Sequence, residues 1–143
     1  MKIQTKAVAV ISLLLIAVMI FTACNSNKVP AEGRWADATY LSDTEFGKGS
    51  KTVNVTVKAG ENEVVFTIHS DAKYLGDALL EHELIEGDRG EFGIYIKKVN
   101  GIVADYDVDK TYWGFYKNGE MMMVGVSSAE FSDGDCYELV LDS

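Results

Sequence analysis

Two runs in which apolar and polar residues alternate leave this chain few ways to fold. The apolar members of the two runs are Val53, Val55 and Val57, and then Val64, Phe66 and Ile68. A period of two indicates a β-strand with one buried face. The short segment between the runs, Ala59–Asn62, contains Gly60, and such a connection predicts a β-hairpin. The sequence therefore predicts a sheet with one side packed on a core.

A helical repeat follows this hairpin. Its apolar residues recur at spacings of three and four, at Tyr74, Leu75, Ala78, Leu79 and Ile85. This spacing is typical of an amphipathic helix that packs one face on a sheet. Ser70 and Asp71 provide a helix N-cap, and Gly87 is predicted to end the helix. The glycine inside the repeat, Gly76, indicates a close approach to the sheet.

Turn dipeptides divide the remaining chain into short strands. Residues 92–97 alternate again, and Asn100–Gly101 predicts a tight turn before a short strand at 102–106. Strands at 112–117 and 120–126 flank Asn118–Gly119, and a final strand covers 137–141. The predicted fold class is α+β, with a mostly antiparallel sheet and one helix. The order strand, strand, helix, strand, followed by hairpins, suggests a β-grasp-like arrangement.

The first 23 residues have the composition of an export signal rather than of a folded domain. Lys2 and Lys6 precede an uncharged run from Ala7 to Ala23. The segment Phe21–Cys24 resembles the lipobox of bacterial lipoproteins, in which small residues precede a cysteine. The resemblance implies cleavage before Cys24 and a diacylglyceryl group on its thiol. A plain secretory signal and an uncleaved membrane anchor are the alternatives.

If the lipobox resemblance holds, the chain consists of a lipoprotein signal peptide at 1–23, a lipidated tether and irregular lead-in at 24–50, and a folded domain at 51–143. Cleavage removes two lysines and no acid, which changes the net charge from −9 to −11. Such acidity argues against nucleic acid as a partner, because phosphate binding needs a basic face. The expected location is the extracytoplasmic face of the cell membrane, held by lipid on Cys24.

An aromatic strand offers the best candidate for ligand binding. Tyr112 and Tyr116 point to one face with Gly114 between them, whereas Trp113 and Phe115 point to the other. The glycine is expected to leave a shallow gap between two rings, which suits a flat ligand. Backbone amides near Asn118 would supply polar contacts, and the methionines at 121–123 an adaptable surface. The alternative is ordinary packing of these side chains in the core.

No set of residues predicts catalysis or a resident metal. His69 and His82 lack a partner at the spacing that would place two ligands on one face. Asp105, Asp107 and Asp109 match the opening of a calcium loop, but Lys110 stands where that loop requires glycine. A solvated acidic loop is the alternative. Cys136 is expected to be a small buried residue of the last strand.

Several segments together resemble a bacterial domain of unknown function that is similar to the C-terminal β domain of transcobalamin and intrinsic factor. They are Ala72–Leu79, Tyr112–Glu120, Gly125–Ser127 and Asp133–Asp135. In those vitamin carriers the domain closes over cobalamin against a large helical domain. The resemblance implies that the hairpin around Trp113 and Asn118 lies near a ligand, and it implies no catalysis. The 120 residues that follow the signal leave no room for the helical half.

The sequence thus predicts a membrane-anchored extracellular binding module rather than an enzyme. Its expected ligand is a corrinoid or another small flat molecule, contacted by Tyr112, Trp113, Phe115, Tyr116 and Asn118. No cofactor is predicted. The alternative is a non-catalytic module that docks an envelope protein or acts as a spacer, and that has the fold without the ligand.

Overall fold

The computed structural model describes residues 28–143. The signal peptide and Cys24 therefore lie outside the described residues. Within residues 28–143, no helix combines the length and the apolar composition needed to cross a membrane. The elements are η1 (Gly33–Asp37), β1 (Thr44–Gly47), β2 (Lys51–Ala59), β3 (Asn62–Ser70), α2 (Leu75–Glu81), β4 (Ile85–Gly90), β5 (Gly93–Val99), β6 (Ile102–Val103), α3 (Tyr106–Asp109), β7 (Tyr112–Lys117), β8 (Glu120–Met121), η2 (Val126–Ser128) and β9 (Cys136–Asp142).

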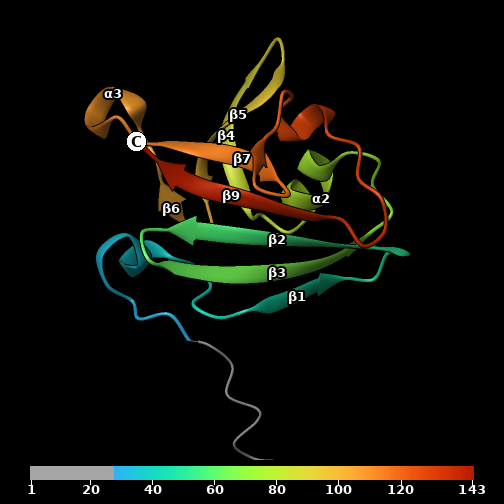
Figure 1. Cartoon of the computed structure of the whole chain (residues 1–143), viewed down its shortest axis with the longest axis horizontal. Coiled ribbons are helices and arrows are strands. Elements are labelled where there is room, and N and C mark those ends of the chain that lie inside the picture. The colour runs from blue at the N-terminus through green and yellow to red at the C-terminus, as the bar shows by residue number, and fades with distance from the viewer. Residues whose placement is uncertain (1–27) are drawn as a thin grey trace, which may run out of the picture.

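A six-stranded main sheet has the order β1-β3-β2-β9-β7-β8. The hairpin of β2 and β3 is confirmed, and the last strand, β9, inserts beside β2 in parallel and beside β7 in antiparallel orientation. A first hairpin, a helix and a last strand returning to the centre of the sheet form the predicted β-grasp-like arrangement. A small sheet, β4-β5-β6, completes the α+β fold (Figure 1).

The core lies between one face of the main sheet and the layer formed by α2 and the small sheet. The predicted alternation holds, because the apolar residues predicted to face the core, which are Val53, Val55, Val57, Val64, Phe66 and Ile68, are fully buried. From the opposite layer come Leu75, Leu79, Val99 and Ile102, each at most 1% exposed. Burying these side chains supplies most of the driving force for folding, about 25 cal/mol per Å² of apolar area. The other face of the main sheet carries polar residues.

The lead-in before β1 packs on the domain. Val29 and Trp35 belong to the core, and the indole Nε1 of Trp35 donates to the carbonyl of Ala59 at 2.9 Å. The backbone N–H of Val29 donates to the carbonyl of Leu41 at 2.7 Å. The part of the expected tether and irregular lead-in that begins at Val29 is therefore attached to the folded domain. Two apolar side chains anchor this segment despite its irregular sequence.

The helix is shorter than the apolar spacing predicts. It ends at Glu81, and Glu83 has a φ of 55°, outside the range of a right-handed helix. Ile85, expected on the helix, begins strand β4, and Gly87 lies at an irregularity in that strand. Ser70 does not cap the helix, since its Oγ accepts from the backbone N–H of Ala72.

Two later segments also differ from the expectation. The strand predicted at 102–106 ends at Val103, and Tyr106 begins the short helix α3. The strand predicted at 120–126 ends at Met121, because Met122 turns toward the core. The turns at Asn100–Gly101 and Asn118–Gly119 are confirmed, and all four of these residues have positive φ.

Candidate functional site

Two of the predicted ligand-binding aromatics lie in the core. Trp113 and Phe115 are only 7% and 9% exposed. The indole Nε1 of Trp113 donates to the carbonyl of Ile102 at 3.2 Å, and the ring of Phe115 stacks on Tyr137 with centroids 5.5 Å apart. These rings have little surface left for a ligand, so the packing alternative describes both residues.

The other face of β7 does not contain the expected gap. A Cβ at Gly114 would lie 2.7 Å from Cε2 of Tyr116 and 2.6 Å from Oδ2 of Asp142, so these groups already occupy that space. The hydroxyl of Tyr116 donates to Asp142 at 2.6 Å. This hydrogen bond, with burial, raises the pKa of Tyr116 to about 12. Tyr112 is half-buried at the start of the strand, in register with Asp142.

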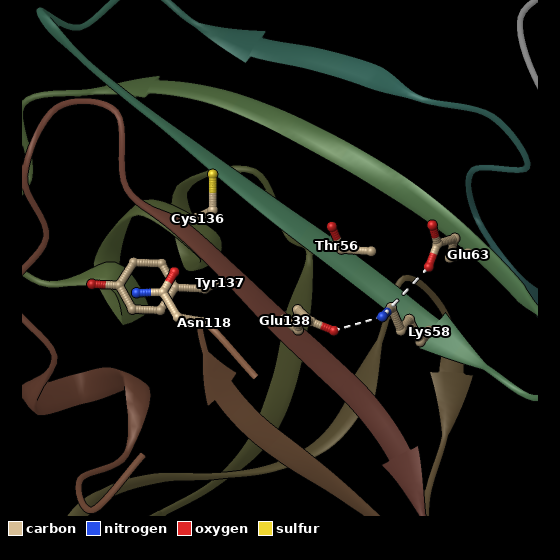
Figure 2. Close-up of a pocket in the computed structure, with 7 residues that line it drawn as sticks. All are labelled: Thr56, Lys58, Glu63, Asn118, Cys136, Tyr137 and Glu138. Atoms are coloured by element: carbon tan, nitrogen blue, oxygen red, sulfur yellow. Dashed lines mark ion pairs between the residues drawn. The ribbon is translucent and has the colours of Figure 1, made fainter. Parts of the chain in front are cut away.

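Asn118 lines a small polar hollow of about 210 Å³ on the outer face of the main sheet. Figure 2 shows Lys58 of β2 between Glu138 of β9 and Glu63 of β3. The Nζ of Lys58 lies 2.7 Å from Oε2 of Glu138 and 3.7 Å from Oε2 of Glu63. The hydrogen bond to Glu138 raises the pKa of the Lys58 ammonium. The charges of this hollow therefore already pair with one another.

Cys136 lines the same hollow and is exposed, contrary to the expected burial. It is the first residue of β9, and the alternation of that strand places Tyr137, not Cys136, in the core. The sequence pattern itself predicts this outcome, because Cys136 is out of phase with Tyr137, Leu139 and Leu141.

Two of the three aspartates at 105–109 serve the local fold. Asp105 caps α3 by accepting from the backbone N–H of Asp107. Asp109 pairs with Arg34 at 2.7 Å and accepts from the hydroxyl of Thr111. Its bonds with Thr111 and Arg34 lower the pKa of Asp109 to about 2. Within residues 28–143, no three His, Cys, Asp or Glu side chains come together as a metal site.

The two histidines lie near a shallow opening between β1, β3 and the end of α2. His69 contacts Glu45 and Thr52 through its two ring nitrogens. His82 stacks on Phe46 with ring centroids 5.2 Å apart, and its buried Nε2 has no hydrogen-bond partner among the described residues. The two rings thus have separate partners.

Another opening lies at the end of the β4–β5 hairpin, which we call the arm (residues 85–99). This opening, the arm cleft, has a volume of about 480 Å³. One side is formed by Glu91, Phe92 and Gly93, and the other by Met123, Val124, Gly125, Ser127 and Ser128. Phe92 is 87% exposed and Met123 97% exposed. Large apolar side chains exposed together typically mark a binding surface.

Local structure explains why these apolar side chains face solvent. Phe92 occupies the turn of the arm, between Gly90 and Gly93, which pair with each other. The arm projects away from the main sheet, so its turn cannot reach the core (Figure 1). On the opposite side, the backbone N–H of Met122 donates to the carbonyl of Phe115 at 2.9 Å. Met122 packs on the core, and its neighbour Met123 points outward.

The methionine segment of the sequence predicts one residue of this cleft. The methionines at 121–123 are expected to form an adaptable surface, and of these Met123 lines the cleft. The sequence pattern places Phe92 at the start of an alternating strand, which implies burial. The flanking glycines, Gly90 and Gly93, were the available signal, because a residue between two turn glycines belongs to the tip of a hairpin.

Comparison with known proteins places the chain among solved relatives. The crystal structure of a "putative metal binding protein" from Ruminococcus gnavus is 38% identical, with a TM-score of 0.63, over 66% of this chain and 98% of that one. Haptocorrin in complex with Cbi is 23% identical, with a TM-score of 0.50, over 68% of this chain. The chain spans only 26% of haptocorrin, and this likeness concerns the fold. No curated protein matches.

A family match agrees with the resemblance drawn from the sequence. The family described as a domain of unknown function, DUF4430, matches residues 73–138. The matched segment runs from just before α2 into β9, so it includes the arm and the arm cleft. This chain aligns with 98% of the Ruminococcus gnavus relative, and 38% of the aligned residues are identical. Unrelated proteins that share only a fold have a much lower sequence identity. The chain therefore belongs to the DUF4430 family.

Proposed function

We propose that this protein is a non-catalytic binding module that takes a corrinoid or another small flat molecule in the arm cleft. The observation that carries the proposal is the exposure of Phe92 and Met123 on the two sides of one opening. Its volume, about 480 Å³, falls within the range of roughly 300–1,000 Å³ that is typical of small-molecule sites. The fold likeness to haptocorrin in complex with Cbi supports a corrinoid as the first ligand to test.

The side chains of the cleft suit such a ligand physically. An aromatic ring offers a flat apolar face, and a thioether adapts to irregular shapes. Glycine and serine at the base of the cleft, Gly93, Gly125 and Ser127, let a ligand approach backbone groups that can hydrogen-bond to it. Because the cleft is open, a bound ligand keeps part of its surface in water, so we expect micromolar rather than nanomolar affinity.

We further propose that the module works on the extracytoplasmic face of the cell membrane, held by lipid on Cys24. The lipobox-like segment Phe21–Cys24 supports this location. Cys24→Ser in the full-length protein should move it from the membrane fraction to the soluble fraction or leave an unprocessed precursor. Mass spectrometry should find the wild-type thiol acylated, and a free Cys24 thiol with residues 1–23 still attached would contradict this part of the proposal.

Ligand binding is tested by titrating full-length protein in detergent micelles with cobinamide and with cobalamin. We expect a change in the corrinoid absorbance spectrum that saturates. Phe92→Ala and Met123→Ala should each weaken binding about tenfold or more, because each removes the large apolar contact from one side of the cleft. Val108→Ala is the matched control, since Val108 is 80% exposed on α3 and does not line the cleft.

The same variants distinguish the alternative function. If neither corrinoid changes its spectrum at high micromolar concentration, the small-molecule proposal is wrong. Co-purification of one envelope protein that is lost with Phe92→Ala and kept with Val108→Ala would then favour a protein-docking module. Binding that is equal in all three variants would place the ligand outside the arm cleft.

A further inference from the structure

We propose that Ser127 is the positioning residue of the arm cleft. Its hydroxyl holds the distal arm (residues 87–96) against the opposite side and thereby sets the width of the cleft. The inference rests on the proposed function in one respect only, that the arm cleft is where the ligand binds. The position of the distal arm itself can be measured without any ligand.

The central observation is a single hydrogen bond. The backbone N–H of Ile94 donates to Oγ of Ser127 at 3.0 Å. Among residues 28–143, this is the one hydrogen bond that joins the distal arm to a segment outside the small sheet. The ion pairs of the arm, such as Lys97–Asp88 and Lys98–Glu86, connect its two strands to each other. They leave the angle between the arm and the body undetermined.

Gly93 allows this contact to form. It has a φ of +100°, and a Cβ at this position would lie 2.4 Å from Cβ of Ser127 and 2.6 Å from its Oγ. Any other residue would push the distal arm away from Ser127, and positive φ also favours glycine there. Both Gly93 and Ser127 line the cleft. Their contact therefore lies at the base of the cleft, where a small displacement changes the separation between Phe92 and Met123.

The opposite side of the contact is held by helix α2. The backbone N–H of Leu75 donates to the carbonyl of Ala129 at 2.8 Å. A Cβ at Gly76 would lie 3.1 Å from the backbone of Val126 and Ser127, so η2 packs directly on the helix. The Ser127 backbone is thus fixed to the core by α2, and its hydroxyl is free to hold the distal arm.

The experiment compares Ser127→Ala with Ser132→Ala in full-length protein in detergent micelles. Ser132 is the matched control, because it is an exposed serine outside the cleft and its side chain makes no hydrogen bond to the described residues. Amide hydrogen exchange is followed in peptides covering 87–96 and, as the reference, 53–57 of the buried strand β2. Binding of cobinamide is titrated for both variants and for the wild type.

We expect Ser127→Ala to accelerate exchange in residues 87–96 about tenfold, the effect of losing one hydrogen bond, with residues 53–57 unchanged. Cobinamide binding should weaken several-fold in Ser127→Ala, and Ser132→Ala should behave as the wild type. Unchanged exchange at 87–96, or an equal increase at 53–57, would overturn the inference. So would equal cobinamide affinity of Ser127→Ala and the wild type. If the wild type binds no cobinamide, the proposed function fails, and the exchange rates alone decide whether Ser127 positions the arm.

Discussion

The ring of Tyr116 and the carboxylate of Asp142 fill the space that a side chain at residue 114 would need. The sequence shows that Tyr112, Gly114 and Tyr116 share one face of β7, and this is correct. It does not show which way a long side chain leans along its strand, because that depends on a hydrogen bond to a residue of β9. A gap inferred from a glycine is therefore open only if no neighbouring ring covers it.

The Tyr116 hydroxyl should contribute to stability in a pH-dependent manner. Tyr116→Phe removes the hydrogen bond to Asp142 and should lower the free energy of unfolding by about 1 kcal/mol at pH 7. The folded-state pKa of Tyr116 is raised to about 12 from 10.0, so this contribution is present below pH 10 and is lost as the pH rises through about 12.

Urea unfolding at pH 7 and pH 11 checks this expectation. The control is Tyr112→Phe, since the Tyr112 hydroxyl makes no hydrogen bond to another described residue. The stability difference between wild type and Tyr116→Phe should be smaller at pH 11 than at pH 7, and that between wild type and Tyr112→Phe should stay small at both. A Tyr116→Phe effect no larger than that of Tyr112→Phe at pH 7 would contradict the assigned role.

At the scale of elements, Gly87 shows what the arm requires of its sequence. It lies where the register between β4 and β5 shifts, and a Cβ there would lie 1.9 Å from the carbonyl oxygen of Tyr95. Gly87→Ala should therefore separate the two strands and destabilise the protein by about 1–3 kcal/mol. Gly90→Ala in the same strand is the matched control, because its Cβ would lie 3.8 Å from the nearest atom.

Thermal unfolding of the two variants, together with exchange of the arm amides, measures this effect. Gly87→Ala should lower the unfolding midpoint and accelerate exchange across residues 87–96, whereas Gly90→Ala should leave both near the wild-type values. Equal effects of the two substitutions would mean that the irregularity at Gly87 tolerates a side chain, and that the arm does not depend on close packing there.

Elements with a strong local pattern were predictable, and those fixed by distant contacts were not. Alternation identified β2, β3, β5, β7 and β9, and it gave the correct buried face in β2 and β3. It misassigned Ile85, because this residue is apolar at helical spacing yet reaches the core from strand β4. The parallel pairing of β2 with β9 joins segments about eighty residues apart, and no local pattern encodes it.

At the scale of the whole molecule, the lead-in and the small sheet depend on each other. Trp35 inserts into the core, and Arg34 beside it reaches α3, where it contacts Asp109 and also donates to the carbonyl of Val103. Residues 75 positions apart in the chain thus meet at one end of the domain. From the sequence alone, Asp109 belongs only to a spacing that resembles a calcium loop. Its partner Arg34 is distant in the sequence, so this ion pair cannot be predicted without the structure.

The Asp109–Arg34 pair should make stability depend on acid pH. The folded-state pKa of Asp109 is lowered to about 2 from 3.8, first by the Thr111 hydroxyl and then by Arg34. Its contribution is therefore fully present above pH 3.8 and is lost as the pH falls through about 2. Asp109→Asn should be less stable than the wild type at pH 6, and the difference should shrink between pH 4 and pH 2.

Urea midpoints at pH 6, 4, 3 and 2 test this expectation. Asp107→Asn is the control, because the Asp107 carboxylate pairs with no cation among residues 28–143. A pH-independent difference would show that Asp109 acts through its shape in the α3 turn rather than through its charge.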